Sequence, residues 1–226
     1  KFENALLLAK KNNKPVIALK GGKTAAGARA TAAHTASNPL KGVDYAAIFK
    51  RTGVLEVQSL SEMIDCSQFY AKGLTLFGNK VGIISISGGA GVLLSDQLEA
   101  NGLSITGFSD ELYTTMEPLL PSFSTVQNPV DLTAALVARP EMLRETTQQL
   151  VDSTEFDAVV IFMGLMDSVA QQLTDALLKL KSKPSCPVFL IWMGGNKALL
   201  TQIAQHGILV FEEIPDLVTL LSNVKP

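Results

Sequence analysis

The chain has 226 residues and a mass of 24.1 kDa, which suits one large domain or two small ones. Hydrophobic residues make up 47% of it and charged residues only 18%, so we expect a buried core and exclude a disordered chain. The net charge of -2 shows no basic excess, so we expect no nucleic acid and no membrane as partner.

The first 75 residues predict helices and two strands around a long loop. In chain order we expect a helix at 2–12, a strand at 15–20, a small-residue loop from Gly21 to about Gly42, a helix at 43–52, a strand at 54–57 and a helix at 59–71. Ser59 followed by Glu62 predicts a capping box. Two strands are too few for an independent sheet of this class. This half therefore either joins the sheet of the second half or is the tail of a domain that begins upstream, and we favour the tail.

The second half alternates between strands and helices. Strands are expected at 80–87, 103–108, 156–164, 187–194 and 207–212, with helices after Gly91 and at 168–182, 196–207 and 215–224. Continuous apolar strands separated by helices indicate a parallel sheet that is covered on both faces. Five such strands predict an α/β fold with a flavodoxin-like doubly wound sheet. The domain boundary is expected in 72–80, where Gly73 and Gly78 interrupt the pattern.

The two cysteines and the short apolar runs indicate the cellular location of the protein. Cys66 and Cys186 cannot build a disulfide framework and form no CxxC pair, which favours a cytoplasmic location. With two histidines they also make no recognisable zinc pattern, so no metal site is predicted. Apolar runs such as 188–193 are far shorter than the roughly 20 residues that span a bilayer. Because the chain begins with Lys1 and not with methionine, we expect a piece of a longer polypeptide.

The loop at 21–42 is the strongest chemical feature of the sequence. It follows a strand, and its glycines and alanines allow a ligand to approach the backbone. Its polar and charged residues are Lys23, Arg29, His34, Thr35, Ser37 and Asn38. The two cations suit phosphate or carboxylate, and a histidine among small residues can act as a nucleophile. Taken alone, the pattern favours a flexible surface loop with a solvated histidine over a ligand site.

Two further segments place polar groups at strand ends. At 84–98 a strand runs through Ser87, Gly88, Gly89, Ala90 and Gly91 straight into a helix, and free N–H groups at a helix start favour phosphate. The segment is neither GxGxxG nor a P-loop, so a ligand-free βα turn remains the alternative.

At 120–134, Asn128 and Asp131 flank Pro129 in a polar, turn-forming stretch. This stretch is expected at the edge of the sheet where open α/β folds bind ligands. A structural turn is the equal alternative.

These segments together resemble the succinyl-CoA synthetase superfamily. KPVIALKGGKTAAGARATAAHTASNPLKG is similar to its phosphohistidine loop, and closest to that of the nucleoside-diphosphate-forming acyl-CoA synthetases, including ADP-forming acetyl-CoA synthetase. DYAAIFKRTGVLEVQSLSEMID, KVGIISISGGAGVLLSDQLEANGL, STVQNPVDLTA and GILVFEEIPDLVTLL continue the resemblance over nearly the whole chain. It implies that residues 1–76 are the C-terminal part of a first succinyl-CoA synthetase-like domain and that residues 77–226 are a second, flavodoxin-like ligase domain.

The resemblance also implies an activity and a set of site residues. Members of the family interconvert acid, CoA and ATP with acyl-CoA, ADP and phosphate, and His34 would carry the phosphoryl group. Ser87, Gly88, Gly89, Ala90 and Gly91 would hold that group at a helix start, with Lys23 or Arg29 neutralising it. CoA, ATP or ADP and Mg²⁺ are expected for the full-length protein. CoA-binding and ATP-grasp domains or subunits, a small carboxylic acid and a homo-oligomeric assembly are the expected partners, and the fragment alone is expected to be inactive.

The loop departs from the family pattern after the histidine. The family has His-Thr-Gly where this chain has His34, Thr35 and Ala36, and the Ala-Gly that follows is replaced around Pro39, Leu40 and Lys41. An alanine disfavours the positive φ that a glycine accepts. Two alternatives to the ligase therefore stay open. One is a non-catalytic module for acyl-CoA sensing or scaffolding, as in the ligase-like parts of protein lysine acetyltransferases, and the other is a plain flavodoxin-like interaction domain.

Overall fold

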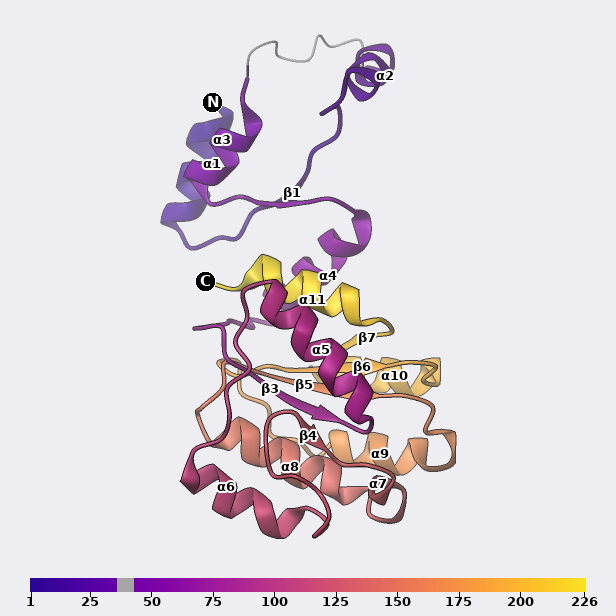
Figure 1. The fold of residues 1–226 in the computed structure, drawn as a ribbon. Coiled ribbons are helices and arrows are strands. Elements are labelled where there is room, and N and C mark those ends of the chain that lie inside the picture. The colour runs from indigo at the N-terminus through magenta and orange to yellow at the C-terminus, as the bar shows by residue number, and fades with distance from the viewer. Residues whose placement is uncertain (36–42) are drawn as a thin grey trace. The chain divides into compact units, whose positions relative to one another are not determined.

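The chain, described by a computed structural model, divides into two compact units. The structure describes residues 1–35 and 43–226. The first unit is Lys1–Tyr70 and the second is Ala71–Pro226 (Figure 1). Among the described residues, no helix is both long and apolar enough to cross a membrane.

The first unit is built on a small parallel sheet of its own. Its elements are α1 (Phe2–Lys11), β1 (Ile17–Leu19), α2 (Ala25–Thr35), α3 (Tyr45–Thr52), β2 (Leu55–Val57) and α4 (Leu60–Ala71). Strands β1 and β2 pair in parallel, with Ile17 opposite Leu55. They form a two-stranded sheet that is separate from the sheet of the second unit. The expected alternative in which this half joins the second sheet is therefore wrong.

The loop predicted at 21–42 is wrong over 25–35, where the chain forms helix α2. Six of these eleven residues are alanine, the strongest helix former, and Thr24 begins the helix by accepting a hydrogen bond from the Gly27 amide at 3.0 Å. The glycines and small residues that suggested a loop are thus outweighed by helix propensity. The predicted site positions Ser37 and Asn38, and the departures at 36 and 39–41, lie outside the described residues.

Half of the capping box predicted at the start of α4 is confirmed, the bond to the serine. The Glu62 amide donates to Ser59 Oγ at 3.1 Å, and the Glu62 carboxylate accepts from the backbone N–H of Gln58 at 2.9 Å. The carboxylate thus reaches one residue beyond the usual partner, the N-cap amide. Two backbone donors at the helix start are satisfied.

The second unit has the predicted doubly wound parallel sheet. Its strands are β3 (Val81–Ser85), β4 (Val130–Asp131), β5 (Ala158–Met163), β6 (Val188–Trp192) and β7 (Leu209–Phe211), in the order β4-β3-β5-β6-β7. Every neighbouring pair is parallel. Helices α5 (Gly88–Ala100) and α11 (Ile214–Val224) pack together on one face, and α8 (Glu141–Asp152) and α9 (Ala170–Leu177) lie on the other (Figure 1). Shorter elements complete the unit: α6 (Asp110–Met116), α7 (Ala135–Ala138), α10 (Lys197–Gln205) and the 3₁₀ turns η1 (Glu117–Leu119) and η2 (Asp167–Val169).

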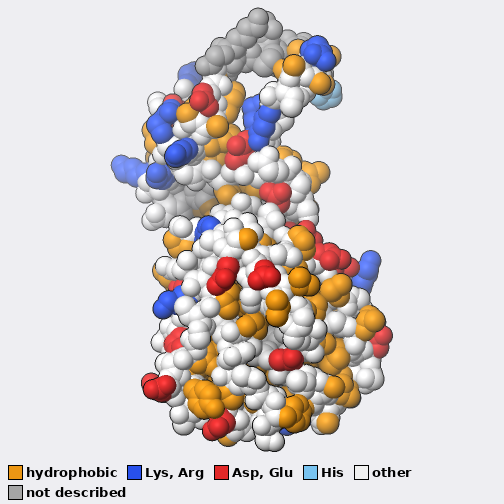
Figure 2. All heavy atoms as spheres, viewed as in Figure 1, with side chains coloured by type: hydrophobic (Ala, Val, Ile, Leu, Met, Phe, Trp, Pro, Cys, Tyr) orange, Lys and Arg blue, Asp and Glu red, His pale blue; other side chains and the backbone are white. Residues whose placement is uncertain are grey.

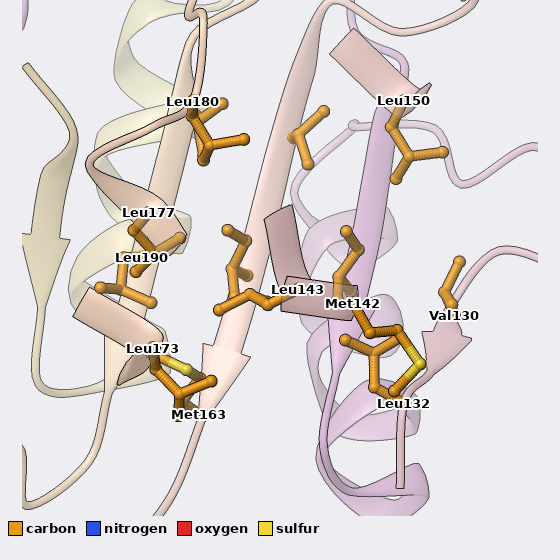
Figure 3. Close-up of a cluster of buried hydrophobic side chains, with 14 of the residues drawn as sticks. Val130, Leu132, Met142, Leu143, Leu150, Met163, Leu173, Leu177, Leu180 and Leu190 are labelled. Atoms are coloured by element: carbon orange, nitrogen blue, oxygen red, sulfur yellow. The ribbon is translucent and has the colours of Figure 1, made fainter. Parts of the chain in front are cut away.

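One core cluster of this unit fills the space between the sheet and helices α8 and α9. Figure 3 shows Met142, Leu143 and Leu150 from α8 together with Leu173 and Leu177 from α9. They meet side chains of β4, β5 and β6, all of them buried. Strands β3, β5 and β6 are buried along their whole length, as their unbroken apolar sequences predict.

The strand predicted at 103–108 is wrong, and β4 takes its place in the sheet. Within 103–108 only Ser104 makes a bridge, to Lys80. Further along β3, the side-chain amide of Asn128 forms hydrogen bonds with the backbone of Val81 and Ile83. The next residues of the strand, Ile84 and Ser85, pair with β4. The edge of β3 that 103–108 would occupy is thus already taken.

Candidate functional site

A glycine-rich turn joins β3 to α5 at the carboxyl edge of the sheet. Ser87 is the N-cap of α5, and its Oγ accepts from the Ala90 amide at 3.4 Å. The hydroxyl of the buried Ser85 fixes the turn, because it accepts from the Ser87 amide at 3.0 Å and donates to the Ser87 carbonyl at 2.7 Å. The first amides of a helix have no intrahelical partner, so this helix start offers N–H donors and the positive end of the helix dipole.

Two glycines of this helix start are closely packed against the segment that contains β4. A Cβ at Gly88 would lie 3.1 Å from Asp131 Oδ2, and a Cβ at Gly91 would lie 3.3 Å from the Pro129 side chain. A Cβ at either position would require the neighbouring side chain to shift by a few tenths of an ångström. The two segments that the sequence singled out are therefore brought together here.

A cavity of about 350 Å³ lies between them. Its lining comes from the end of β3, the first turns of α5 and residues 123–133; the predicted site residues among it are Ser87, Gly88, Gly91 and Asp131. Gly89 and Ala90 belong to the same helical turn without lining the cavity. The charged side chain in the described lining is that of Asp131.

Asp131 and Asn128 have different positions in this segment. Asp131 Oδ1 accepts from the Thr133 amide at 2.9 Å, and its second oxygen faces the start of α5. Asn128 does not line the cavity. Its Oδ1 accepts from the Ile83 amide at 2.8 Å, and its Nδ2 donates to the carbonyls of Val81 at 2.9 Å and Thr106 at 3.0 Å. Asn128 therefore holds the segment in place beside β3.

The rim of the cavity is apolar and exposed. Phe123 is 74% exposed and Val92 is 61% exposed, and both line the cavity. Hydrophobic side chains are visible on the face of the second unit that carries α5 (Figure 2). In the same lining, the Ser124 hydroxyl oxygen is buried and has no hydrogen-bond partner among the described residues. Apolar side chains combined with a few polar groups are typical of the lining of a small-molecule site.

The other predicted site residues belong to the first unit. His34 is exposed in the last turn of α2, in a helix and not in the predicted loop. Arg29 is also exposed on α2, but five residues of helix place it about 140° around the axis from His34. Lys23 precedes α2, where its Nζ lies 2.9 Å from Glu56 Oε1 and donates to Gln58 Oε1 at 3.1 Å. Lys23 thus connects the chain before α2 to the β2 segment.

A second cavity of about 410 Å³ lies beside this ion pair in the first unit. It is lined by Lys20, Gly22, Lys23, Val43, Asp44, Tyr45, Ala46 and Glu56. Lys20 Nζ lies 4.9 Å from the centre of the Tyr45 ring, and Asp44 caps α3 by accepting from the Ala47 amide. The acidic and basic side chains of this cavity are balanced, and all four are already engaged by neighbours in the same unit.

Sequence reasoning missed several residues that build the first cavity. Ser85 was read as an ordinary strand residue, and Thr133 and Ser124 were not distinguished from the rest of their segment. The signal for Thr133 was present, because an aspartate two residues before a threonine is typical of an Asx turn. The remaining signals are tertiary contacts. In residues 1–35 and 43–226, no group of three or more His, Cys, Asp or Glu side chains is arranged to hold a metal ion.

Comparison with known proteins shows two kinds of domain in sequence. The family model of the succinyl-CoA ligase-like flavodoxin domain matches residues 1–70, and the model of the Ligase-CoA domain matches residues 81–165. Together these segments span more than half of the chain, and they follow one another in the order that the resemblance implied.

Among curated proteins, the chain is similar to ADP-forming acetate–CoA ligases. It is 36% identical over 147 residues to the alpha subunit of acetate–CoA ligase II from Pyrococcus furiosus, a match that covers 65% of this chain and 32% of the relative. It is 32% identical over 134 residues to the enzyme from Methanocaldococcus jannaschii, covering 58% and 19% respectively. The matched regions thus make up less than a third of these relatives.

Among solved structures, the fold resembles the dinucleotide-forming acetyl-coenzyme A synthetase 1 of Ca. Korarchaeum cryptofilum, which was determined with phosphate and ADP. The TM-score is 0.81 at 23% identity, over 99% of this chain and 48% of that one. PH0766 from Pyrococcus horikoshii gives a TM-score of 0.75 at 24% identity, with the same coverage. At this identity the likeness shows the fold. By its sequence matches, the chain belongs to the ADP-forming acetyl-CoA synthetase family, with a succinyl-CoA ligase-like flavodoxin domain followed by a Ligase-CoA domain.

Proposed function

We propose that this chain is the central portion of an ADP-forming acyl-CoA synthetase and that His34 is its phosphoryl carrier. The observation that carries the proposal is the Ser87–Gly91 helix start, which opens into a cavity at the carboxyl edge of the sheet. Unpaired helix amides are suited to oxyanions, and carboxyl edges of parallel strands are where open α/β sheets bind ligands. The exposed position of His34 on α2 supports access of a phosphoryl donor.

The proposed chemistry is a set of displacements at phosphorus and carbon. In the synthetic direction a nitrogen of His34 attacks the γ-phosphorus of ATP, and the bond to ADP breaks. The acid's carboxylate then takes the phosphoryl group from the phosphohistidine, which regenerates the imidazole and forms an acyl phosphate. The CoA thiol loses its proton and attacks the acyl carbon, and phosphate leaves. The helix start of α5 would stabilise the phosphoryl oxygens through its N–H groups.

The two cations of the predicted site support this proposal unequally. Lys23 is engaged by Glu56 and Gln58, which favours a role in positioning α2. Arg29 is exposed, and no hydrogen bond or ion pair joins it to another residue that the structure describes, although α2 does not place it on the face of His34. We therefore propose the helix amides as the main phosphate ligands.

The domain organisation is part of the same proposal. We propose that the first unit is the C-terminal part of a larger ligase domain, because its sheet has only two parallel strands and parallel sheets are normally covered and extended. CoA-binding and ATP-grasp domains or subunits would supply the CoA, nucleotide and Mg²⁺ sites, and the location would be cytoplasmic. The acyl group would be that of a small carboxylic acid.

Phosphorylation of His34 tests the proposal directly. The parent protein is incubated with γ-labelled ATP and magnesium, as wild type and as His34→Asn, and is then assayed for acid-labile, base-stable label. We expect label in the wild type and none in His34→Asn. The matched control is His206→Asn, which removes the chain's other histidine, exposed at the end of α10, and should retain the label.

The absence of label would overturn the phosphohistidine. If the wild type binds ATP without becoming labelled, the departure from the family pattern at Ala36 has removed the carrier. The chain would then be a non-catalytic acyl-CoA-sensing or scaffold module, as in the ligase-like parts of lysine acetyltransferases.

A further inference from the structure

The start of α5 carries a carboxylate where a phosphate site would be expected to carry a cation. Asp131 Oδ2 lies 3.1 Å from the position of a Cβ on Gly88, and its other oxygen is held by the Thr133 amide. The described lining of the cavity contains no lysine or arginine. An oxyanion that binds the first amides of α5 must therefore lie beside a negative charge.

This arrangement should bind protonated and unprotonated oxyanions with different affinities. An oxyanion without a proton, such as sulfate, can accept hydrogen bonds from the helix amides but leaves two like charges facing each other at the Asp131 side. A phosphate species that carries a proton can accept from the same amides and donate its P–O–H to the carboxylate. The like charges are then joined by a hydrogen bond.

A separate observation is an unpaired polar group in the lining of the cavity. The Ser124 hydroxyl oxygen is buried and lacks a hydrogen-bond partner among the described residues, and Ser124 lines the same cavity as Asp131. A buried hydroxyl without a partner is costly and is usually satisfied by a ligand or by water. A tetrahedral oxyanion has enough oxygens to reach the helix amides, the carboxylate and this hydroxyl.

We propose that Asp131 is a specificity-determining residue that selects a proton-bearing phosphoryl species at the start of α5 and rejects unprotonated oxyanions. This inference rests on the proposed function, which places a phosphoryl group at that helix start. It adds that the bound group carries a proton and that Asp131 distinguishes the protonated form from the unprotonated form.

The test is an anion titration followed at the site itself. Amide resonances of Gly88, Gly89 and Ala90 are recorded by ¹H–¹⁵N NMR on the ¹⁵N-labelled 226-residue chain, while inorganic phosphate or sulfate is added at constant ionic strength. For the wild type we expect phosphate to bind at least about tenfold more tightly than sulfate, the size of one charge-assisted hydrogen bond. Equal affinities in the wild type would overturn the inference, whatever the variants do.

Two variants identify the residue. Asp131→Asn retains the oxygen that accepts from Thr133 and removes the charge, so phosphate binding should weaken, sulfate binding should strengthen and the ratio should fall towards one. Asp96→Asn makes the same change on an exposed position of α5 that does not line the cavity, and should keep the wild-type ratio. An unchanged ratio in Asp131→Asn would refute the assignment to Asp131. If neither anion shifts the three amides of the wild type, the phosphoryl site of the proposed function fails instead.

Discussion

At the scale of single residues, Asn128 shows how one side chain replaces part of a strand. Its amide group makes three hydrogen bonds to the backbone of Val81, Ile83 and Thr106. In Asn128→Asp the acceptor to Ile83 remains, but the carbonyls of Val81 and Thr106 lose their donor and face a carboxylate. We expect the free energy of unfolding to fall by about 2 kcal/mol or more, measured by urea denaturation.

The matched control for Asn128 is its neighbour Gln127. Gln127→Glu makes the same amide-to-carboxylate change on an exposed side chain, so the unfolding free energy should change by no more than about 0.5 kcal/mol. If both variants lose the same stability, the added charge is responsible and the hydrogen bonds of Asn128 are not.

At the scale of secondary-structure elements, α4 depends on its first turn. Ser59 Oγ accepts from the Glu62 amide, so Ser59→Ala should lower the unfolding free energy of the first unit by about 1 kcal/mol. The exposed Ser61 lies inside the same helix, and Ser61→Ala should be neutral or slightly stabilising because alanine has the higher helix propensity. Circular dichroism during urea denaturation measures both. Equal effects of the two substitutions would show that the cap contributes nothing.

At the scale of the whole molecule, each compact unit contains one buried thiol. Cys66 lies in the first unit and Cys186 in the second, at 0% and 5% exposure. Burial raises the pKa of Cys186 to about 11, so at pH 8 this thiol is protonated until the second unit unfolds. The first unit has a two-stranded sheet and a small core cluster around Leu6, Phe49 and Val54. A smaller core gives a lower stability, so the first unit should unfold first.

Pulsed alkylation in a denaturant series, followed by peptide mass mapping, resolves the two thiols. We expect Cys66 to become reactive at a lower denaturant concentration than Cys186. A shared midpoint would mean that the two units unfold as one cooperative body.

Features that depend on neighbouring residues could be predicted from the sequence. Alternating strands and helices, the glycine-rich turn at Ser87–Gly91 and the capping box at Ser59 follow from propensity, periodicity and local hydrogen bonds. The one large local error, a loop at 25–35, came from weighing small residues as flexible where alanine favours a helix.

The hydrogen-bond partners and charge contacts between distant segments became known from the tertiary structure. Strand β4 and Asn128, and not 103–108, bond to the edge of β3. Lys23 pairs with Glu56, and Asp131 lies against Gly88. Each of these contacts joins residues more than 30 positions apart, and its energy depends on the packing of a whole sheet. No local pattern encodes such a contact, because the residues involved fit several alternative partners equally well until the core fixes one.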